Sequence, residues 1–236
     1  MVTGASSGIG QVTAIECTKL GAKVVITARN QDRLNGTFSQ LIGDGHHQVL
    51  ADLTDGSQIQ HLSDMLPTID GLVLCAGKGM TAPFAYSSRE KYDDVFNVNF
   101  FSPVELLRIL IKKKKLQPDS SVVFVSSIGG NGSYNIGNAI YGASKAAIDA
   151  TMKFCAKELA EKRIRVNSVC PGMVDTKLIR EGSFSEEQLD NEIDKYPLKR
   201  FGNPLEVAYG IVYLLSNASS WVTGTSLIID GGYLLK

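Results

Sequence analysis

The chain opens with Met1-Val2 and continues Thr3-Gly4-Ala5-Ser6-Ser7-Gly8-Ile9-Gly10, a glycine-rich stretch at the start of a helical pattern. In a turn of this kind, backbone N–H groups and a helix N-terminus can hold a pyrophosphate. The glycine spacing is G-x-x-x-G-x-G rather than G-x-G-x-x-G, and taken alone it also fits an ordinary tight turn. Residues later in the chain decide between these two possibilities.

Short apolar runs alternate with longer amphipathic segments after this turn. We predict strands at residues 23–28, 48–52, 71–75, 121–126, 164–170 and 226–230, and helices that include residues 8–20, 87–115, 138–162 and 204–216. The apolar runs are nearly continuous, which is typical of strands covered on both faces. The alternation predicts a single-domain, Rossmann-like α/β fold: a doubly wound parallel sheet with helices on both faces.

Two parts of the pattern are irregular. Met1-Val2 is short for the strand that should precede the turn, so the first strand is either very short or truncated. Residues 174–202 are mostly polar and contain Gly182 and Pro197, which suits a mobile lid over a pocket. No linker divides the remainder, so we predict one domain over residues 1–236.

The composition favours a small-molecule ligand. The 236 residues include 24 Lys and Arg and 24 Asp and Glu, so no overall charge attracts nucleic acid or a membrane surface. No apolar run reaches the ~20 residues of a membrane span, and the N-terminus lacks a signal-peptide pattern. We expect a soluble, cytoplasmic protein. The scattered cysteines and histidines predict reduced thiols and no metal site.

Residues after the second and third predicted strands indicate which nucleotide binds. Ala28-Arg29 places a guanidinium where an NAD enzyme usually has an acid for the ribose 2′-hydroxyl. Arginine can bind a 2′-phosphate bidentately, so Arg29 predicts NADP(H), although it also fits a solvated loop residue. Asp52 could accept a hydrogen bond from the adenine amine or cap the next helix beside Thr54.

A tyrosine and a lysine are spaced for acid–base chemistry. In Tyr141-Gly142-Ala143-Ser144-Lys145, at the front of a predicted helix, the first and last residues lie one turn apart on one face. A phenol has a pKa near 10, and a neighbouring ammonium lowers it by favouring the phenolate. Such a pair is a usable general acid and base. The spacing also arises by chance, with a half-buried tyrosine beside a solvated lysine.

The order of these motifs resembles the short-chain dehydrogenase/reductase family over essentially the whole chain. The matching residues are the turn at residues 3–10, Asp52-Leu53, Asn97-Val98-Asn99, Ser126-Ser127, Tyr141 with Lys145, Pro171-Gly172 with Val174 and Thr176, Arg200-Phe201-Gly202, and Asp230-Gly231-Gly232. The resemblance implies an NADP(H)-dependent oxidoreductase that moves a hydride between the nicotinamide and a carbonyl or alcohol carbon.

The resemblance also implies roles for the reacting residues. Tyr141 would donate a proton to the carbonyl oxygen, Ser127 would hydrogen-bond that oxygen, and Lys145 would support the tyrosine and bind the nicotinamide ribose. Ser127 is preferred because it is the second serine of S-S-x-x-G, although its gap to Tyr141 is one residue longer than the family pattern. Ser126 stays open as the alternative.

An asparagine completes this set. Asn99 aligns better than Asn97 with the position of the family's active-site asparagine. It would fix a water that links Lys145 to solvent. The cofactor contacts implied by the resemblance are Gly4, Ser6, Ser7, Gly8, Ile9, Gly10, Arg29, Asp52, Leu53, Ala76, Gly77, Tyr141, Lys145, Pro171, Gly172, Val174 and Thr176.

The chain departs from the family pattern in one place. The family's Asn-Asn-Ala-Gly is replaced by Leu74-Cys75-Ala76-Gly77, which removes side-chain hydrogen bonds between neighbouring strands. This departure predicts a less rigid sheet at that point. We expect Cys75 to be a small buried apolar residue rather than a redox thiol.

The substrate is the least determined property. Arg29, Asn131-Gly132 and Arg200-Phe201-Gly202 resemble 3-oxoacyl-acyl-carrier-protein reductases, whose acidic carrier would need a basic surface near the pocket. Lys112-Lys113-Lys114-Lys115 and Lys162-Arg163 are candidates, although such runs also form solvated helix ends. The alternatives are a reductase of a free small ketone, sugar or steroid-like alcohol, or a catalytically silent NADP(H)-binding module. The resemblance further implies a homotetramer.

Overall fold

The computed structural model describes residues 1–176 and 185–235. These residues form a seven-stranded sheet in the order β3-β2-β1-β4-β5-β6-β7, in which every strand pair is parallel. The predicted doubly wound parallel sheet is therefore confirmed. The strands are β1 (Val2–Thr3), β2 (Val25–Ala28), β3 (His47–Leu50), β4 (Ile69–Leu74), β5 (Leu116–Val125), β6 (Arg165–Pro171) and β7 (Ser226–Ile229).

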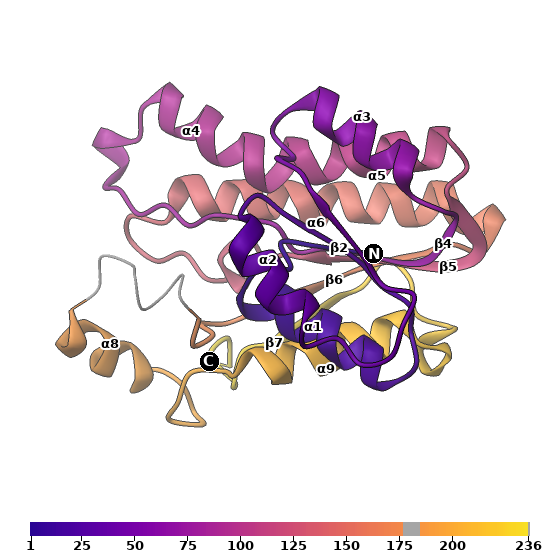
Figure 1. Ribbon diagram of the computed structural model, residues 1–236. Helices are drawn as coiled ribbons and strands as arrows, with labels where there is room; N and C mark the ends of the chain where they lie inside the picture. The colour runs from indigo at the N-terminus through magenta and orange to yellow at the C-terminus, as the bar shows by residue number, and fades with distance from the viewer. Residues whose placement is uncertain (177–184, 236) are drawn as a thin grey trace.

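Helices cover both faces of this sheet (Figure 1). One face carries α3 (Gly56–Met65), α4 (Arg89–Phe96), α5 (Ser102–Lys112) and α6 (Ala139–Leu159), and the other carries α1 (Gly8–Lys19), α2 (Gln31–Phe38) and α9 (Pro204–Leu215). Alternate strand residues face opposite layers, because Leu72 and Leu74 join the first core and Val73 the second. In the described ranges, no helix has the length and apolar character of a membrane span.

The strand order reverses at β1, which lies between β2 and β4. Such a reversal leaves a crevice at the carboxyl ends of the two central strands. β1 has only two residues, yet the Thr3 hydroxyl accepts backbone hydrogen bonds from Cys75 at 3.0 Å and Ala76 at 3.2 Å. These two bonds tie β1 to the end of β4, the point at which the missing asparagines predict a less rigid sheet.

The helix predicted over residues 87–115 is confirmed from Arg89 to Lys112, but it is not a regular α-helix throughout. α4 is followed by a π-helical turn at Asn97–Phe101, then by α5, and β5 already begins at Leu116. In the π-helical turn, the Ser102 N–H donates to the carbonyl of Asn97, five residues back. The physical reason is Pro103, which has no N–H to donate to the carbonyl of Asn99 four residues earlier.

Helix α6 is fixed to the sheet by the buried Asp149, which is 7% exposed. Its carboxylate accepts hydrogen bonds from Ser126 at 2.8 Å, Ser168 at 2.6 Å and Ser226 at 3.3 Å. These serines lie just after β5, in β6 and in β7. Because Asp149 lies one turn after Lys145, this network sets the front of α6 against the carboxyl ends of three strands.

The predicted lid at residues 174–202 is described only in part, because residues 177–184 lie outside the described residues. The remainder contains α8 (Glu186–Ile193), a helix that the sequence analysis missed although Ser185 and Gln188 form a capping box. The hydroxyl of the buried Tyr196 accepts the N–H of Met173 at 2.7 Å, and burial raises the pKa of Tyr196 to about 12. This bond fixes the segment after β6.

Candidate active site

A cleft of about 1420 Å³ opens at the carboxyl ends of the strands. It exceeds the roughly 300–1,000 Å³ of a typical small-molecule pocket, so it has room for a cofactor and a second molecule. Gly10 and Asn99 lie behind its surface. The other predicted catalytic and cofactor residues line it: Gly4, Ser6, Ser7, Gly8, Ile9, Arg29, Asp52, Leu53, Ala76, Gly77, Ser127, Tyr141, Lys145, Pro171, Gly172, Val174 and Thr176.

The glycine-rich turn lies in contact with the end of β4. Gly4 has a φ of +64°, and a Cβ there would lie 2.8 Å from the Cα of Ala76. A Cβ on Gly10 would lie 2.5 Å from the carbonyl oxygen of Gly4. Ser7, the N-cap of α1, makes no side-chain cap hydrogen bond. The N–H groups of the first turn therefore have no partner from Ser7 and suit an anion.

Arg29 and Asp52 lie together in the cleft, just after β2 and β3. Nη1 of Arg29 is 3.8 Å from Oδ2 of Asp52, and the arginine side chain is 63% exposed. Asp52 also accepts hydrogen bonds from the backbone and hydroxyl of Thr54, at 2.9 and 2.8 Å. The N-cap of α3 is Asp55, so the alternative that Asp52 caps this helix is wrong.

Two further residues beside Arg29, Asn30 and Arg33, were not predicted from the sequence and also line the cleft. Asn30 is the N-cap of α2, and its side chain accepts the N–H of Arg33 at 2.9 Å. Arg33 is exposed and has no ion-pair partner in the part of the chain that the structure describes. The signal for it was the N-cap asparagine three residues earlier, directly after β2.

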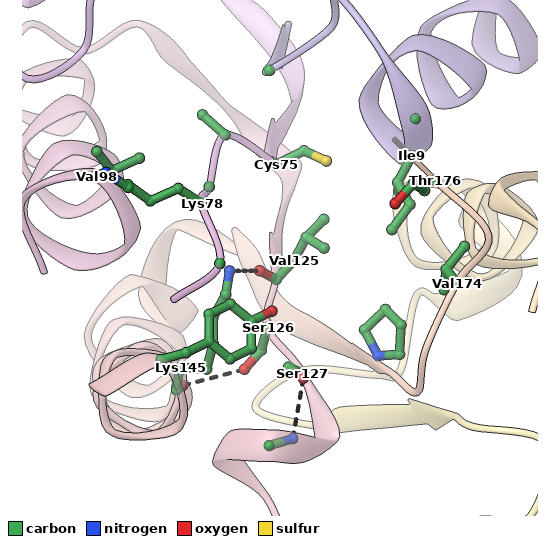
Figure 2. A pocket seen from close by; sticks show the side chains of 18 of the residues that line it. Ile9, Cys75, Lys78, Val98, Val125, Ser126, Ser127, Lys145, Val174 and Thr176 are labelled. Carbon is green, nitrogen blue, oxygen red and sulfur yellow. Dashed lines mark hydrogen bonds between the residues drawn. The ribbon is translucent and has the colours of Figure 1, made fainter. Parts of the chain in front are cut away.

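Lys145 lies beside Tyr141 in the cleft. Its side chain is buried, with 5% exposure, and Nζ donates to the carbonyl of Val125 at 2.8 Å (Figure 2). Nζ lies 5.7 Å from the centroid of the Tyr141 ring. The structure thus holds a buried ammonium next to the phenol, one helical turn away, rather than a solvated lysine.

The two adjacent serines have different surroundings (Figure 2). Ser126 is 3% exposed and its hydroxyl is used by Asp149 at 2.8 Å and the Lys145 carbonyl at 3.2 Å. Ser127 lines the cleft, and its Oγ accepts the N–H of Gly129 at 3.1 Å, so its hydroxyl hydrogen is available to a ligand. The geometry therefore favours Ser127 over Ser126.

Gly129 shows that Ser127 and Tyr141 are near each other. A Cβ on this glycine would lie 3.4 Å from Oγ of Ser127 and 3.8 Å from Cδ1 of Tyr141. Both side chains therefore border the same backbone position. Both side chains also line the cleft.

Asn99 does not line the cleft, and its side chain instead connects neighbouring segments of the protein. It is 1% exposed, and its carboxamide bonds to the backbone N–H and carbonyl of Lys78, at 2.8 and 3.0 Å, and to the Ser144 hydroxyl at 3.0 Å. A Cβ on Gly77 would lie 3.3 Å from Oδ1 of Asn99 and 3.5 Å from Nζ of Lys145. Both polar atoms of the side chain are therefore bonded within the protein.

Cys75 lines the same cleft near the turn. Burial raises the pKa of its thiol to about 11. The thiol is therefore protonated at physiological pH, which agrees with a small apolar residue and not with a redox thiol.

The two basic clusters lie away from the cleft. Because α5 and α6 run from the carboxyl edge of the sheet to the amino edge, Lys112 and Lys162 lie at the edge opposite the cleft. Within these clusters, Lys113 pairs with Asp64, and Arg163 pairs with Asp119 through bonds of 2.6 and 2.9 Å. The prediction of a basic surface near the pocket is wrong for a single chain.

Known proteins share this architecture and sequence. A family model described as enoyl-(acyl carrier protein) reductase matches residues 4–234. The 3-oxoacyl-acyl-carrier-protein reductase of Thermotoga maritima is 36% identical over 242 residues, which cover 100% of this chain and 97% of that protein. A solved short chain dehydrogenase/reductase family protein has a TM-score of 0.88 at 30% identity, with 99% of this chain and 96% of that chain covered.

A variant of actinorhodin polyketide ketoreductase solved with NADPH has a TM-score of 0.90 at 28% identity, with 100% of this chain and 96% of that chain covered. The likeness in sequence and in fold thus extends over the full length of the chain. The chain belongs to the short-chain dehydrogenase/reductase family, whose members are oxidoreductases that use nicotinamide cofactors.

Proposed function

We propose that this protein is an NADP(H)-dependent carbonyl reductase in which Tyr141 is the proton donor. The observation that carries this proposal is the buried ammonium of Lys145, 5.7 Å from the Tyr141 ring, inside the cleft that also contains the glycine-rich turn. A catalytically silent module would have no need to bury a charge beside a phenol, because burial costs free energy unless the charge is used or paired.

The residues around the cleft fit an NADP(H) molecule. The first turn of α1 would bind the pyrophosphate, and Gly4 lies too close to Ala76 for any side chain to fill this cradle. Arg29 and Arg33 would bind the ribose 2′-phosphate, which a guanidinium attracts and a carboxylate repels. Asp52 would accept a hydrogen bond from the adenine amine. The segment at residues 171–176 would hold the nicotinamide side.

When bound, the nicotinamide supplies a hydride to the carbonyl carbon, and the π electron pair of the C=O bond moves to the oxygen. Tyr141 transfers its hydroxyl proton to that oxygen, which completes the alcohol. The Lys145 ammonium stabilises the phenolate that is left. Ser127 donates a hydrogen bond to the same oxygen as negative charge develops there.

The proton of Tyr141 has to be replaced after each turnover. The carbonyl of Asn99 lacks an α-helical donor because of Pro103, so it can accept a hydrogen bond from a water. Such a water would pass a proton to the phenolate by way of Lys145. In this proposal the side chain of Asn99 positions the segment at Lys78, and its backbone holds the water.

We infer a 3-oxoacyl thioester as the substrate class, by analogy with the Thermotoga maritima relative. A carrier-linked form rests on that analogy alone, because the basic clusters lie opposite the cleft. The same-class alternative is a free small ketone, sugar or steroid-like alcohol. Reduction of a C=C bond, which the family description names, is a second reaction to test.

The decisive experiment measures oxidation of NADPH and NADH with an acetoacetyl thioester, a crotonyl thioester, a simple ketone and a sugar. We expect turnover of the acetoacetyl thioester with NADPH. Tyr141→Phe keeps the ring but removes the proton, so turnover should fall by ~10²- to 10⁴-fold while NADPH binding is retained. The matched control is Tyr209→Phe, because Tyr209 is 55% exposed on α9 and outside the cleft.

Two results would contradict the proposal. Near-normal turnover by Tyr141→Phe would mean that another group donates the proton. Reduction of the crotonyl thioester without reduction of any carbonyl would mean that the reaction takes place at a C=C bond.

A further inference from the structure

The cleft extends past Tyr141 into an end that the nucleotide contacts leave unassigned. This end is walled by residues 78–81 after β4, by residues 133–136 and Asn138 before α6, and by Met173, Glu192, Lys195, Tyr196 and Tyr233. If Tyr141 protonates the carbonyl oxygen, as the proposed function requires, the rest of the substrate has to lie here. The chemistry of this wall therefore indicates the chemistry of the substrate.

Two large apolar side chains on this wall are exposed to solvent. Tyr134 is 89% exposed and Ile136 is 98% exposed, and both line the cleft. A single exposed apolar residue is ordinary on a protein surface. A neighbouring pair at the mouth of a cleft instead indicates a surface that becomes buried when a ligand binds.

The loop that carries this pair is anchored on both sides. On one side, the N–H of Ala82 donates to the carbonyl of Gly137 at 2.9 Å. On the other side, the hydroxyl of Tyr233 donates to Oδ1 of Asn135 at 3.2 Å. These bonds hold the two apolar side chains at the mouth and use the polar side chain that lies between them in the sequence.

Aromatic and methionine side chains contribute further apolar surface to this end. The ring of Tyr233 packs against Tyr196 with 4.8 Å between centroids, and Tyr196 packs against Phe201 with 5.9 Å. Met80 and Met173 line the same end and are half-buried. Methionine side chains adapt to differently shaped apolar ligands, so this wall suits a flexible apolar group.

The charged side chains near this end are already paired. Nζ of Lys78 lies 2.6 Å from Asp94, and Lys195 forms an ion pair with Glu192. Apart from Lys145, the described lining here offers no unpaired lysine or arginine to a phosphate or carboxylate group. A charged sugar would therefore lose its hydration without gaining a counter-ion.

We infer that the substrate carries an apolar body beyond its reacting carbonyl, as a medium-length 3-oxoacyl chain does, and that Tyr134 and Ile136 bind this body and set chain-length specificity. This inference deepens the proposed function and rests on it for the position of the carbonyl. The two residues act on substrate binding and not on the chemical step.

The test compares 3-oxobutanoyl and 3-oxooctanoyl thioesters of N-acetylcysteamine in NADPH oxidation by the parent protein, Tyr134→Ser and Ile136→Ser. The parent protein should have the higher kcat/KM for the 3-oxooctanoyl thioester. Each variant should lose roughly 10-fold in kcat/KM for the 3-oxooctanoyl thioester, as expected for lost apolar contact. The loss for the 3-oxobutanoyl thioester should be small. Leu20→Ser is the matched control, because Leu20 is 73% exposed at the end of α1, at the opposite edge of the sheet.

Calorimetric titration of the same thioesters into the protein saturated with NADP⁺ measures binding without turnover. One outcome separates the two proposals: the 3-oxooctanoyl thioester binds more tightly than the 3-oxobutanoyl thioester, Ile136→Ser weakens this binding, and no carbonyl is turned over. This outcome would reject the proposed function and support the apolar site. Turnover with equal losses on both chain lengths would overturn the inference. A change in oligomer size in Ile136→Ser would also overturn it, because the side chain would then bind a second copy of the chain.

Discussion

Arg29, the proposed ligand of the 2′-phosphate, has only a weak partner in the protein itself. Its contact with Asp52 spans 3.8 Å and the side chain is 63% exposed, so the pair adds little to the free energy of unfolding. A 2′-phosphate would present a stronger partner to this guanidinium than Asp52 does. The residue is therefore better explained by cofactor choice than by stability.

Removing this guanidinium should separate the two cofactors. We expect Arg29→Ala to raise KM for NADPH by roughly 10-fold or more, the loss of a charge-assisted hydrogen bond, and to leave KM for NADH nearly unchanged. Arg33→Ala should act in the same direction. Arg89→Ala, which removes an exposed arginine on α4, is the control. Equal losses for the two cofactors would contradict the assignment.

The signals for the proposed reacting residues are local, so their proximity could be predicted from sequence. Tyr141 and Lys145 are one helical turn apart, so their proximity follows from the helix alone. Arg33 was missed although its signal is also local, the N-cap Asn30. Tyr196 could not be found in this way, because it lines the cleft only through the folding of segments distant in sequence. The choice between Ser126 and Ser127 also required the structure, since Asp149 uses the hydroxyl of one and not of the other.

Tyr196 should make the stability of the protein depend on alkaline pH. Its pKa is raised to about 12 by burial, whereas an unfolded tyrosine titrates near 10. Between about pH 10 and about pH 12 the folded chain retains a proton that the unfolded chain has lost. The free energy of unfolding contributed by this group therefore falls as the pH rises through this window, and it is fully present below pH ~10.

Tyr196→Phe should remove that contribution. Urea unfolding near neutral pH should show a loss of ~1 kcal/mol, because the N–H of Met173 loses its acceptor. Above about pH 10 the gap between variant and parent should narrow. A gap that stays constant over this range would show that the tyrosine does not titrate as described.

Among the elements, α6 connects the sheet to the reacting groups. Asp149 binds three serine hydroxyls that follow or belong to β5, β6 and β7, and this carboxylate lies one turn from Lys145. Its position in the helix was predictable, but its partners were not, because they come from three separate strands. The π-helical turn between α4 and α5 was likewise missed, since a proline is acceptable in the first turn of a helix.

Asp149 should therefore matter for folding more than an exposed acid does. Asp149→Ala leaves buried hydroxyls without their acceptor and should lower the free energy of unfolding by about 3 kcal/mol. Asp149→Asn keeps one acceptor oxygen and should cost less. Asp93→Ala on α4, which removes an exposed ion pair, should cost ~0.5 kcal/mol or less. Urea unfolding measures all three, and equal costs for the two Asp149 variants would contradict the network.

At the scale of the whole molecule, the parallel sheet was predictable because continuous apolar strands alternate with helical segments. The assembly was not, because helix residues such as Leu106 and Met152 could face either a core or a partner. The structure places both in the core of this chain. Phe101 and Phe154, in contrast, are 55% and 70% exposed on the side of α5 and α6.

A second exposed apolar region lies at the other end of the sheet. The edge strand β7 exposes Ile228 at 45%, and Trp221, just before it, is 97% exposed. An edge strand has unpaired backbone groups that favour association with another chain. Two separate self-complementary surfaces on one chain generate a tetramer with two kinds of two-fold interface.

We therefore predict a homotetramer whose two interfaces can be disrupted independently. Phe154→Glu should yield dimers joined through the β7 side, and Trp221→Glu should yield dimers joined through the α5 and α6 side, because a buried charge without a partner opposes each contact. Leu20→Glu, a charge placed on an exposed residue outside both regions, should leave the tetramer intact. Light scattering at micromolar concentration measures each mass. A parent protein that is a stable monomer would refute the assembly, and a tetramer in both interface variants would mean that the contacts lie elsewhere.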